Sequence, residues 1–388
     1  MKSSKMNSLQ RLVSFILIAI LLICTVSFAA NGWQSTNDDP DSGEVGDATD
    51  KTDENTDGNS PPKDNNSDNT QDGDSTQNPN ENETPDEPIV ELPKYYSSIT
   101  GLEISEEAAF TTPVGYVLNP SMPLYGISDS DLTIEFPIEN GSTRILSYTT
   151  NSSTLWKVGS LAPTRAFISS SSNFFGGIVV SYGNDDIVKY SVWDTSKIDL
   201  DISKISECYY IENTLYVYTS KELVDLAKQK SPMLNTSTYK TAPYLFNDAE
   251  DDILGTTKAS SVILPFSNSN ETELYYSESS KQYLYFKSGS RKVDMLNGKN
   301  VSFTNIFVLF SNATTYEKSS GTELVIDTTS GGAGYYISKG HMTEIRWSVD
   351  QNGALEFKTL KGEKLTVNKG NAYISYYKAS NSSKVTVA

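Results

Sequence analysis

The distribution of apolar residues divides the chain into three stretches. An apolar run extends from Val13 to Ala30, and from Asn37 to Pro93 almost every residue is polar. From Tyr95 onward, short apolar runs recur until the end of the chain. This order predicts a targeting segment, a polar spacer and a folded body, because only the third stretch can bury enough surface to form a core.

The first part of the body, residues 95–250, mixes signals for strands and a helix. The segments Leu132 to Phe136 and Arg144 to Tyr148 alternate with the period of strands, and Asn140-Gly141 between them predicts a hairpin. Further strands are expected at Ile178 to Ser181 and Leu215 to Thr219. Ser220 to Ala227 has the capping serine and the spacing of a helix. This pattern predicts a mixed α/β N-terminal domain.

Beyond about Asn247 the helical signals stop, and alternating runs arrive at intervals of about ten residues. A boundary is therefore expected between Phe246 and Lys258, followed by an all-β antiparallel domain, sandwich or barrel-like, over 256–378 and a tail over 379–388. The fold class is α+β. The expected strands are Ser261 to Phe266, Leu274 to Tyr276, Tyr283 to Phe286, Ile306 to Phe310, Leu324 to Asp327, Tyr335 to Ile337, Glu344 to Ser348, Leu355 to Lys358, Lys364 to Val367 and Ala372 to Tyr376.

Residues 1–29 have the features of a secretory signal. Lys2, Lys5 and Arg11 precede the apolar run, and Ser27-Phe28-Ala29 offers small residues for cleavage after Ala29. The run is also long enough to span a bilayer as an uncleaved anchor. Cys24 suggests lipid attachment as a third alternative, although Ile23 stands where such signals usually have a small residue. All three place the body outside the cytoplasmic membrane, with membrane contact only through this segment if it is retained.

The acidic charge of the chain is concentrated in the spacer, residues 30–94. Of the formal net charge of −18, the segment from Asp38 to Glu91 carries 18 Asp and Glu residues against Lys51 and Lys63. Its composition is typical of a disordered, self-repelling tether. The body is close to electrically balanced and shows no basic stripe, which argues against nucleic acid as a partner.

The cysteine and histidine content restricts the chemistry. After cleavage Cys208 is the sole cysteine, and His341 is the sole histidine of the whole chain. No intramolecular disulfide can form, and no Cys/His cluster predicts a metal site or any other cofactor. We interpret His341 as a turn or surface residue rather than a catalytic base, and Ser330 to Gly334 as a hairpin or bulge rather than a phosphate loop.

Glu135 and Glu139 are the one carboxylate pair that we nominate for glycoside hydrolysis. Such enzymes hold one carboxylic acid protonated a few ångströms from its partner. Arg144 would keep both ionised, so structural salt bridges are the preferred interpretation. A two-residue turn at Asn140-Gly141 would place Pro137 opposite Arg144, with a glutamate on each diagonal. That register predicts either a structural ladder or, with Arg165, a patch for an anionic or sugar ligand.

The order of several motifs resembles the YerB-like predicted lipoproteins of Gram-positive bacteria, over nearly the whole body from about Ile99 to Tyr376. The first set includes Asn119-Pro120, Gly126-Ile127-Ser128, Glu139 to Arg144 and Thr164 to Phe167; the second includes Tyr283 to Phe286, Asp294, Thr304-Asn305-Ile306, Gly332 to Tyr336, Trp347 and Leu365 to Ile374. The resemblance implies a two-domain envelope protein without an established activity.

The same resemblance implies a polar ligand or catalytic site in the N-terminal domain. This chain keeps Asn119, Glu135, Glu139, Arg144 and Arg165 of that set. It departs from the family at four places: Met122 and Ala162 replace arginines, Tyr182 to Asp185 replaces a Gly-Gly-Ser-Pro turn, and Leu215 to Ser220 replaces a stretch that begins with histidine. The expected function is a noncatalytic envelope module that contacts wall polymer or another envelope protein; the alternative is a wall-directed hydrolase that uses the retained residues.

Overall fold

A computed structural model describes most of the body, and strands dominate it. The described residues are 94–111, 113–150, 157–183, 198–201, 209–211, 215–217, 242–248, 255–318 and 321–388. The signal, nearly all of the spacer, Cys208 and the helix expected from Ser220 lie outside them. Within these ranges no helix is long and apolar enough to cross a membrane.

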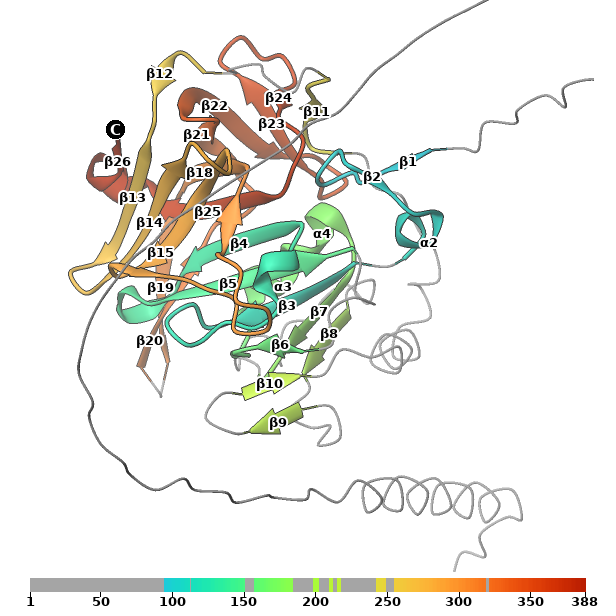
Figure 1. Ribbon diagram of the computed structural model, residues 1–388. Coiled ribbons are helices and arrows are strands. Elements are labelled where there is room, and N and C mark those ends of the chain that lie inside the picture. The colour runs from blue at the N-terminus through green and yellow to red at the C-terminus, as the bar shows by residue number, and fades with distance from the viewer. Residues whose placement is uncertain are drawn as a thin grey trace, which may run out of the picture. The chain divides into compact units, whose positions relative to one another are not determined.

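The central element of the fold is a sheet in which eleven strands of the described residues take part (Figure 1). Ten of them follow the order β12-β22-β21-β18-β25-β4-β5-β3-β7-β8, and β23 pairs with β22. The β18–β25, β25–β4, β3–β7 and β7–β8 pairs are parallel. Their bounds are β3 Val114–Leu118, β4 Leu132–Pro137, β5 Thr143–Thr149, β7 Ile178–Ser181, β8 Ile198–Asp201, β12 Thr257–Lys258, β18 Asn305–Ser311, β21 Gly332–Ser338, β22 His341–Val349, β23 Leu355–Thr359 and β25 Ala372–Lys378.

A second, antiparallel sheet packs on one face of the large sheet. Its order is β16-β15-β14-β13-β26, and β17 also pairs with β15. Alternate residues of the two sheets, such as Ile145, Val308, Leu274 and Tyr285, form one buried cluster between them, which is the arrangement of a sandwich. The bounds are β13 Ser261–Ser267, β14 Asn270–Ser277, β15 Gln282–Lys287, β16 Ser290–Arg291, β17 Ser302–Phe303 and β26 Thr386–Val387.

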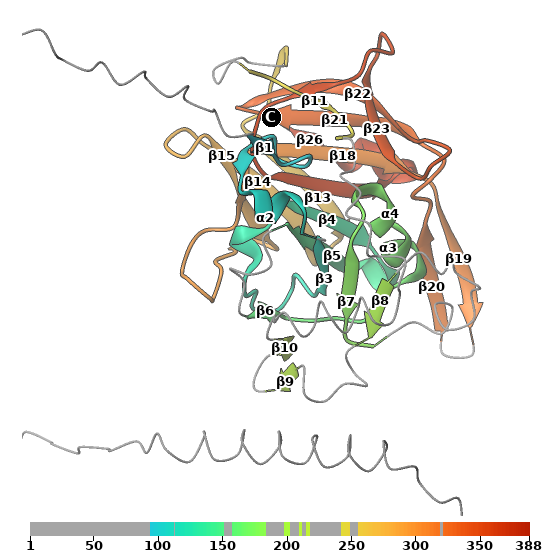
Figure 2. The ribbon, with the colours of Figure 1, turned by 90° about the vertical axis from the view of Figure 1, so that its right-hand side faces the viewer.

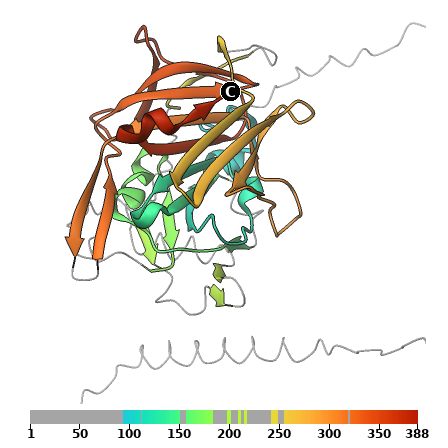
Figure 3. The same cartoon turned by 90° about the vertical axis from the view of Figure 1, so that its left-hand side faces the viewer.

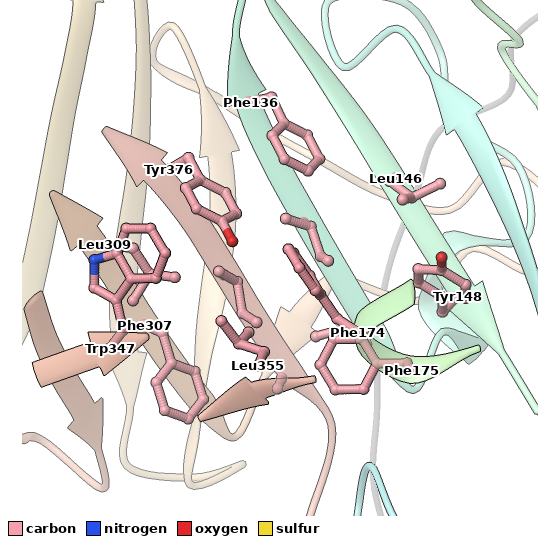
Figure 4. Packing of buried hydrophobic residues seen from close by; sticks show 14 of the residues in the cluster. Phe136, Leu146, Tyr148, Phe174, Phe175, Phe307, Leu309, Trp347, Leu355 and Tyr376 are labelled. Carbon is pink, nitrogen blue, oxygen red and sulfur yellow. The ribbon is translucent and has the colours of Figure 1, made fainter. Parts of the chain in front are cut away.

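The opposite face of the large sheet buries a second cluster, rich in aromatic residues (Figure 4). Phe136 stacks on Tyr376 with a centroid distance of 5.2 Å, and Trp347 meets Tyr376 edge-on. The short helices α3 (Ala166–Ser170) and α4 (Ser172–Phe175) contribute Phe167 and Phe175 to this cluster. Strand alternation therefore gives the sheet two buried faces.

Smaller elements surround the sandwich. They are β1 Tyr95–Tyr96 with β2 Glu103–Ile104, β6 Val158–Gly159 with β10 Leu215–Val217 and β9 Tyr209–Ile211, β11 Leu245–Phe246 with β24 Thr366–Val367, the hairpin β19 Ala313–Lys318 with β20 Gly321–Ile326, the helix α2 Glu106–Ala109, and the 3-10 turns η1 Ile127–Asp129 and η2 Glu139–Gly141. The hairpin β19–β20 extends away from the sheets in Figure 2.

The secondary-structure predictions hold best for the strands. The strand expected at Ile178 to Ser181 is β7, and all the strands expected after residue 260 are present within a few residues. The described protein is mostly β with few, short helices, and its C-terminal sheets are largely antiparallel. A mixed α/β N-terminal domain is not confirmed, because the described helices before residue 250 have four or five residues.

The last residues of the chain are part of the sandwich and not a free tail, so this prediction is corrected. After the 3-10 helix η7 (Ala379–Lys384), β26 pairs with β13. Ala388 exchanges backbone hydrogen bonds with Ser261, at 2.9 and 3.0 Å, and Val385 and Val387 pack against the core. Figure 3 shows the red C-terminal end beside the gold strands of the second sheet.

The two halves of the body share their main sheet. The strand β25 from the second half pairs in parallel with β4 from the first, from Ala372 opposite Leu132 to Ser375 opposite Glu135. Residues from 86 to the C-terminus form one compact unit. Asp294 adds a second link, because its carboxylate accepts hydrogen bonds from the backbone of Gly126 and Ser128, each at 2.8 Å. The boundary expected near 246–258 therefore does not separate two compact units in this structure.

Candidate functional site

Glu135 projects from β4 into the space between the two sheets and is fully buried. Its Oε1 accepts a hydrogen bond from the Lys287 ammonium at 2.6 Å. Its Oε2 accepts from the hydroxyls of Tyr373 at 2.5 Å and Thr272 at 2.8 Å. Lys287 also donates to Thr272 at 2.9 Å. The carboxylate of Glu135 is thus saturated by donors from both sheets.

These contacts decide the protonation of Glu135. Burial alone raises the pKa of a carboxyl, but the charge of Lys287 and the hydrogen bonds from Lys287 and Tyr373 outweigh it and hold the pKa of Glu135 below its ordinary value. Glu135 is therefore an ionised structural group. A glycosidase acid needs a raised pKa and access to the substrate, and Glu135 has neither.

Glu139, Arg144 and Arg165 lie together on the other side of the same sheet. Arg165 Nη2 donates to Glu139 Oε1, and Arg165 Nε lies 3.8 Å from Glu323 Oε1 on β20. The charges of Arg165 and Glu139 both affect the pKa of Arg144. The four residues Glu139, Arg144, Arg165 and Glu323 are called the charged cluster below. Its members come from η2, β5, the start of α3 and β20.

Arg144 has the weakest set of partners in the charged cluster. Its Nη1 donates to the carbonyl oxygen of Thr143 at 3.0 Å, and its buried Nε has no hydrogen-bond partner. Burial, followed by the repulsion from Arg165, lowers the pKa of Arg144 to about 10, while Glu139 acts in the opposite direction. A half-buried guanidinium without a carboxylate at hydrogen-bond distance is unusual, because buried charges are normally paired.

The predicted register of the hairpin is wrong. The turn has three residues, Glu139 to Gly141, because Ile138 N donates to Ser142 O at 2.9 Å. Phe136 therefore stands opposite Arg144, and Pro137 stands opposite Thr143. One extra turn residue reverses the faces of one strand relative to the other. Arg144 shares the aromatic face with Phe136, while Glu135 points to the opposite face, so the predicted Glu135–Arg144–Glu139 ladder does not exist.

Asn119 follows β3 and serves the local chain path. Its side-chain oxygen accepts from Ser121 N at 3.1 Å, and its backbone N donates to Ser160 O at 2.9 Å. Among the described residues, its hydrogen bonds reach Ser121, Met122 and Ser160 and not the charged cluster. Of the five residues nominated from the sequence, the structure thus brings together Glu139, Arg144 and Arg165, and separates Glu135 and Asn119 from them.

The buried roles of Lys287, Asp294 and Glu323 were not predicted from the sequence, although Asp294 belongs to the motifs that carry the resemblance. The alternation Tyr283, Tyr285, Lys287 on β15 places the lysine on the buried face, and this signal was available. Glu323 could not be found in this way, because it meets Arg165 only through the packing of the β19–β20 hairpin beside η2.

The described residues give no support to metal or histidine chemistry. They contain no group of three or more His, Cys, Asp or Glu residues that could hold a metal ion. His341 begins β22, and its Nδ1 lies 3.0 Å from the carbonyl oxygen of Lys339. The segment Ser330 to Gly334 leads from β20 into β21, and the Asp327 carboxylate accepts hydrogen bonds from the backbone N of Thr329 and Ser330. Because β20 pairs with β19 and β21 pairs with β18 and β22, the segment connects two sheets and is not the predicted hairpin or bulge.

Comparison with known proteins finds one solved structure with a similar fold and one matching domain family. The chain is similar to the crystal structure of YerB from Bacillus subtilis, with a TM-score of 0.64 and 22% sequence identity, over 76% of this chain and 100% of that chain. Residues 262–374 match the family described as "Protein of unknown function (DUF3048) C-terminal domain". The comparison with curated proteins gives no match. The described chain thus has a fold similar to that of YerB, and its residues 262–374 are similar to the DUF3048 C-terminal domain.

Proposed function

We propose that the protein is exported and that its folded body is a noncatalytic binding module for wall polymer outside the cytoplasmic membrane. Export is supported by the cations and apolar run of residues 1–29, whether this segment is cleaved, retained as an anchor or lipidated. The acidic composition of the spacer is suited to holding the body away from a membrane surface.

One observation carries the noncatalytic part of the proposal. The two carboxylates nominated for hydrolysis point to opposite faces of one sheet, and Glu135 is ion-paired with Lys287 at 2.6 Å in the core. A hydrolase with these two residues as acid and base would need them on one side of a bound sugar. The charged cluster, in contrast, brings together side chains of both charge signs from four separate segments, which favours contact with a polar polymer.

Wall binding is tested by sedimentation of the mature protein with purified wall material, followed by analysis of the soluble fraction for released fragments. We expect the protein to sediment with the walls and to release no fragments. New fragments that disappear with Glu135→Gln or Glu139→Gln, in variants shown to be folded by circular dichroism, would establish the hydrolase instead. If the protein does not sediment with walls but binds an envelope protein, its partner is that protein and not the wall polymer.

Export is tested separately. Fractionation of cells that express the full chain, with N-terminal sequencing of the product, is expected to find the body outside the membrane. A sequence that begins at Ala30 would identify cleavage after Ala29, and a membrane-bound product would identify the anchor or the lipid. Recovery of the intact chain in the cytoplasm would contradict the proposal.

A further inference from the structure

The pair of Lys287 and Glu135 holds an amine against a carboxyl group in the core of the sandwich. The exposed fractions of the two side chains are 2% and 0%, and Lys287 Nζ lies 2.6 Å from Glu135 Oε1. Glu135 stands on β4 of the large sheet and Lys287 on β15 of the second sheet. Groups that a fold holds in contact in this way react far more readily than the same groups free in solution.

The other contacts of the carboxyl group suit an attack by the amine on the side-chain carbon Cδ of Glu135. Such an attack places negative charge on Oε2, which accepts hydrogen bonds from the hydroxyls of Tyr373 at 2.5 Å and Thr272 at 2.8 Å. Donors aimed at a developing oxyanion in a buried site stabilise a tetrahedral intermediate. Lys287 Nζ also donates to Thr272 Oγ1 at 2.9 Å, and this second contact orients the amine.

We propose that Lys287 and Glu135 condense to an intramolecular amide that crosslinks the two sheets covalently. The Lys287 ammonium first transfers a proton to Oε1, which gives an amine and a carboxylic acid. Nζ then attacks Cδ, so that a C–N bond forms and Oε2 carries the negative charge. A second proton moves from Nζ to the Oε1 hydroxyl, which leaves as water while the carbonyl group re-forms at Oε2. The products are one amide and one water, and no oxidant or reductant is needed.

Burial favours the amide over the ion pair. An ammonium and a carboxylate lose their hydration in the core, whereas an amide carries no net charge and is less costly to bury. The reaction follows folding, because residues 135 and 287 meet only when the two sheets pack. Freshly folded protein therefore holds the ion pair until it reacts. This inference concerns the core alone and does not depend on the proposed wall-binding function.

The experiment is intact-mass spectrometry of the mature protein, denatured at intervals after folding. We expect a growing fraction that is lighter by one water. Proteolysis and tandem mass spectrometry should then find the peptide that contains Glu135 joined to the peptide that contains Lys287. An unchanged mass after several weeks, or a loss of water that maps to other residues, would overturn the inference.

The double variant Glu135→Leu/Lys287→Met removes both reacting groups without leaving a charge unpaired in the core. It is expected to keep its full mass over the same period. A loss of water by the double variant equal to that of the native protein would show that the reaction occurs elsewhere, and the crosslink would be wrong.

Tyr373→Phe tests the catalytic hydroxyl. Loss of one donor to the developing oxyanion should slow the loss of water about a hundredfold. Tyr377→Phe is the matched control on the same strand, because its hydroxyl donates to Pro265 O at 2.6 Å and not to Glu135. The control should react at the rate of the native protein. Equal rates for the two variants would overturn the role assigned to Tyr373.

Discussion

At the scale of single residues, Glu135 shows how a plausible catalytic group can be a structural one. It carries its charge in a fully buried position because Lys287, Tyr373 and Thr272 supply donors to both carboxylate oxygens. Lys287 also lies 4.9 Å from the centre of the Phe266 ring, which favours a cation at that point. The pair connects β4 of the large sheet with β15 of the second sheet.

Substitution Glu135→Gln is expected to lower the free energy of unfolding by about 3–5 kcal/mol, because it leaves the ammonium of Lys287 buried without a counter-charge. Urea denaturation followed by circular dichroism measures this change. The double variant Glu135→Leu/Lys287→Met is the control and should recover much of the loss, since two apolar side chains need no pairing. A loss below about 1 kcal/mol in the single variant would show that the pair contributes little.

The same residue gives a pH dependence with a defined sign. The folded-state pKa of Glu135 is lowered from its ordinary value of 4.5, so its contribution to stability is complete above about pH 4.5. It is lost as the pH falls through the depressed folded-state pKa. The difference in unfolding free energy between the native protein and Glu135→Gln should therefore shrink on acidification below pH 4.5. A difference that stays constant to pH 2 would contradict this assignment.

At the scale of elements, the turn between β4 and β5 fixes which side chains reach which core. Asn140 and Gly141 both have positive φ, 59° and 68°, a conformation that asparagine and glycine adopt most readily. Gly141 also packs tightly: a Cβ there would lie 2.4 Å from Ser267 Cβ on β13. The turn therefore connects the two sheets.

Gly141→Ala is expected to destabilise the protein by about 2–4 kcal/mol, the sum of the cost of a left-handed backbone and of overpacking against Ser267. Gly298→Ala is the matched control, because its φ is 74° and a Cβ there would meet nothing within 4 Å. It should lose about 1–2 kcal/mol. Thermal unfolding of both variants measures the difference in stability. Equal losses of stability would show that overpacking against Ser267 does not destabilise the protein.

The strand β26 provides a second prediction at this scale. Deletion of residues 385–388 removes its pairing with β13 and the packing of Val385 and Val387. We expect a loss of about 2–3 kcal/mol in urea denaturation. The control Thr386→Ala, at an exposed side chain, keeps the backbone pairing and should stay within about 0.5 kcal/mol of the native protein. An unchanged free energy of unfolding after the deletion would show that residues 385–388 behave as a tail.

At the scale of the whole molecule, the two halves depend on each other through β25 and β4. A fragment of residues 256–388 loses the parallel partner of β25 and many residues of both buried clusters. We therefore expect this fragment to remain unfolded by circular dichroism and NMR. Addition of a fragment of residues 94–250 should restore folded signals. Cooperative folding of residues 256–388 alone would instead support the independent domain expected from the sequence.

Much of the local structure could be predicted, because it depends on nearest neighbours along the chain. Alternation found β4, β5, β7 and ten of the fourteen described strands after residue 260; β16, β17, β19 and β26 were not expected. The candidate site was only partly predictable. Arg165 and Glu139 do meet, but the face on which Arg144 lies depends on one turn residue, and a single extra residue reverses every later side chain.

The sequence by itself determined the positions of most strands, the presence of a turn at Asn140-Gly141 and the concentration of acidic charge in residues 38–91, because periodicity and composition are local properties. Only the tertiary structure decided that β25 joins β4, that Lys287 neutralises Glu135 and that Glu323 stands beside Arg165. These partners are separated by more than a hundred residues, and no local pattern encodes which distant strand will bury a given charge. Packing of the two sheets makes that choice.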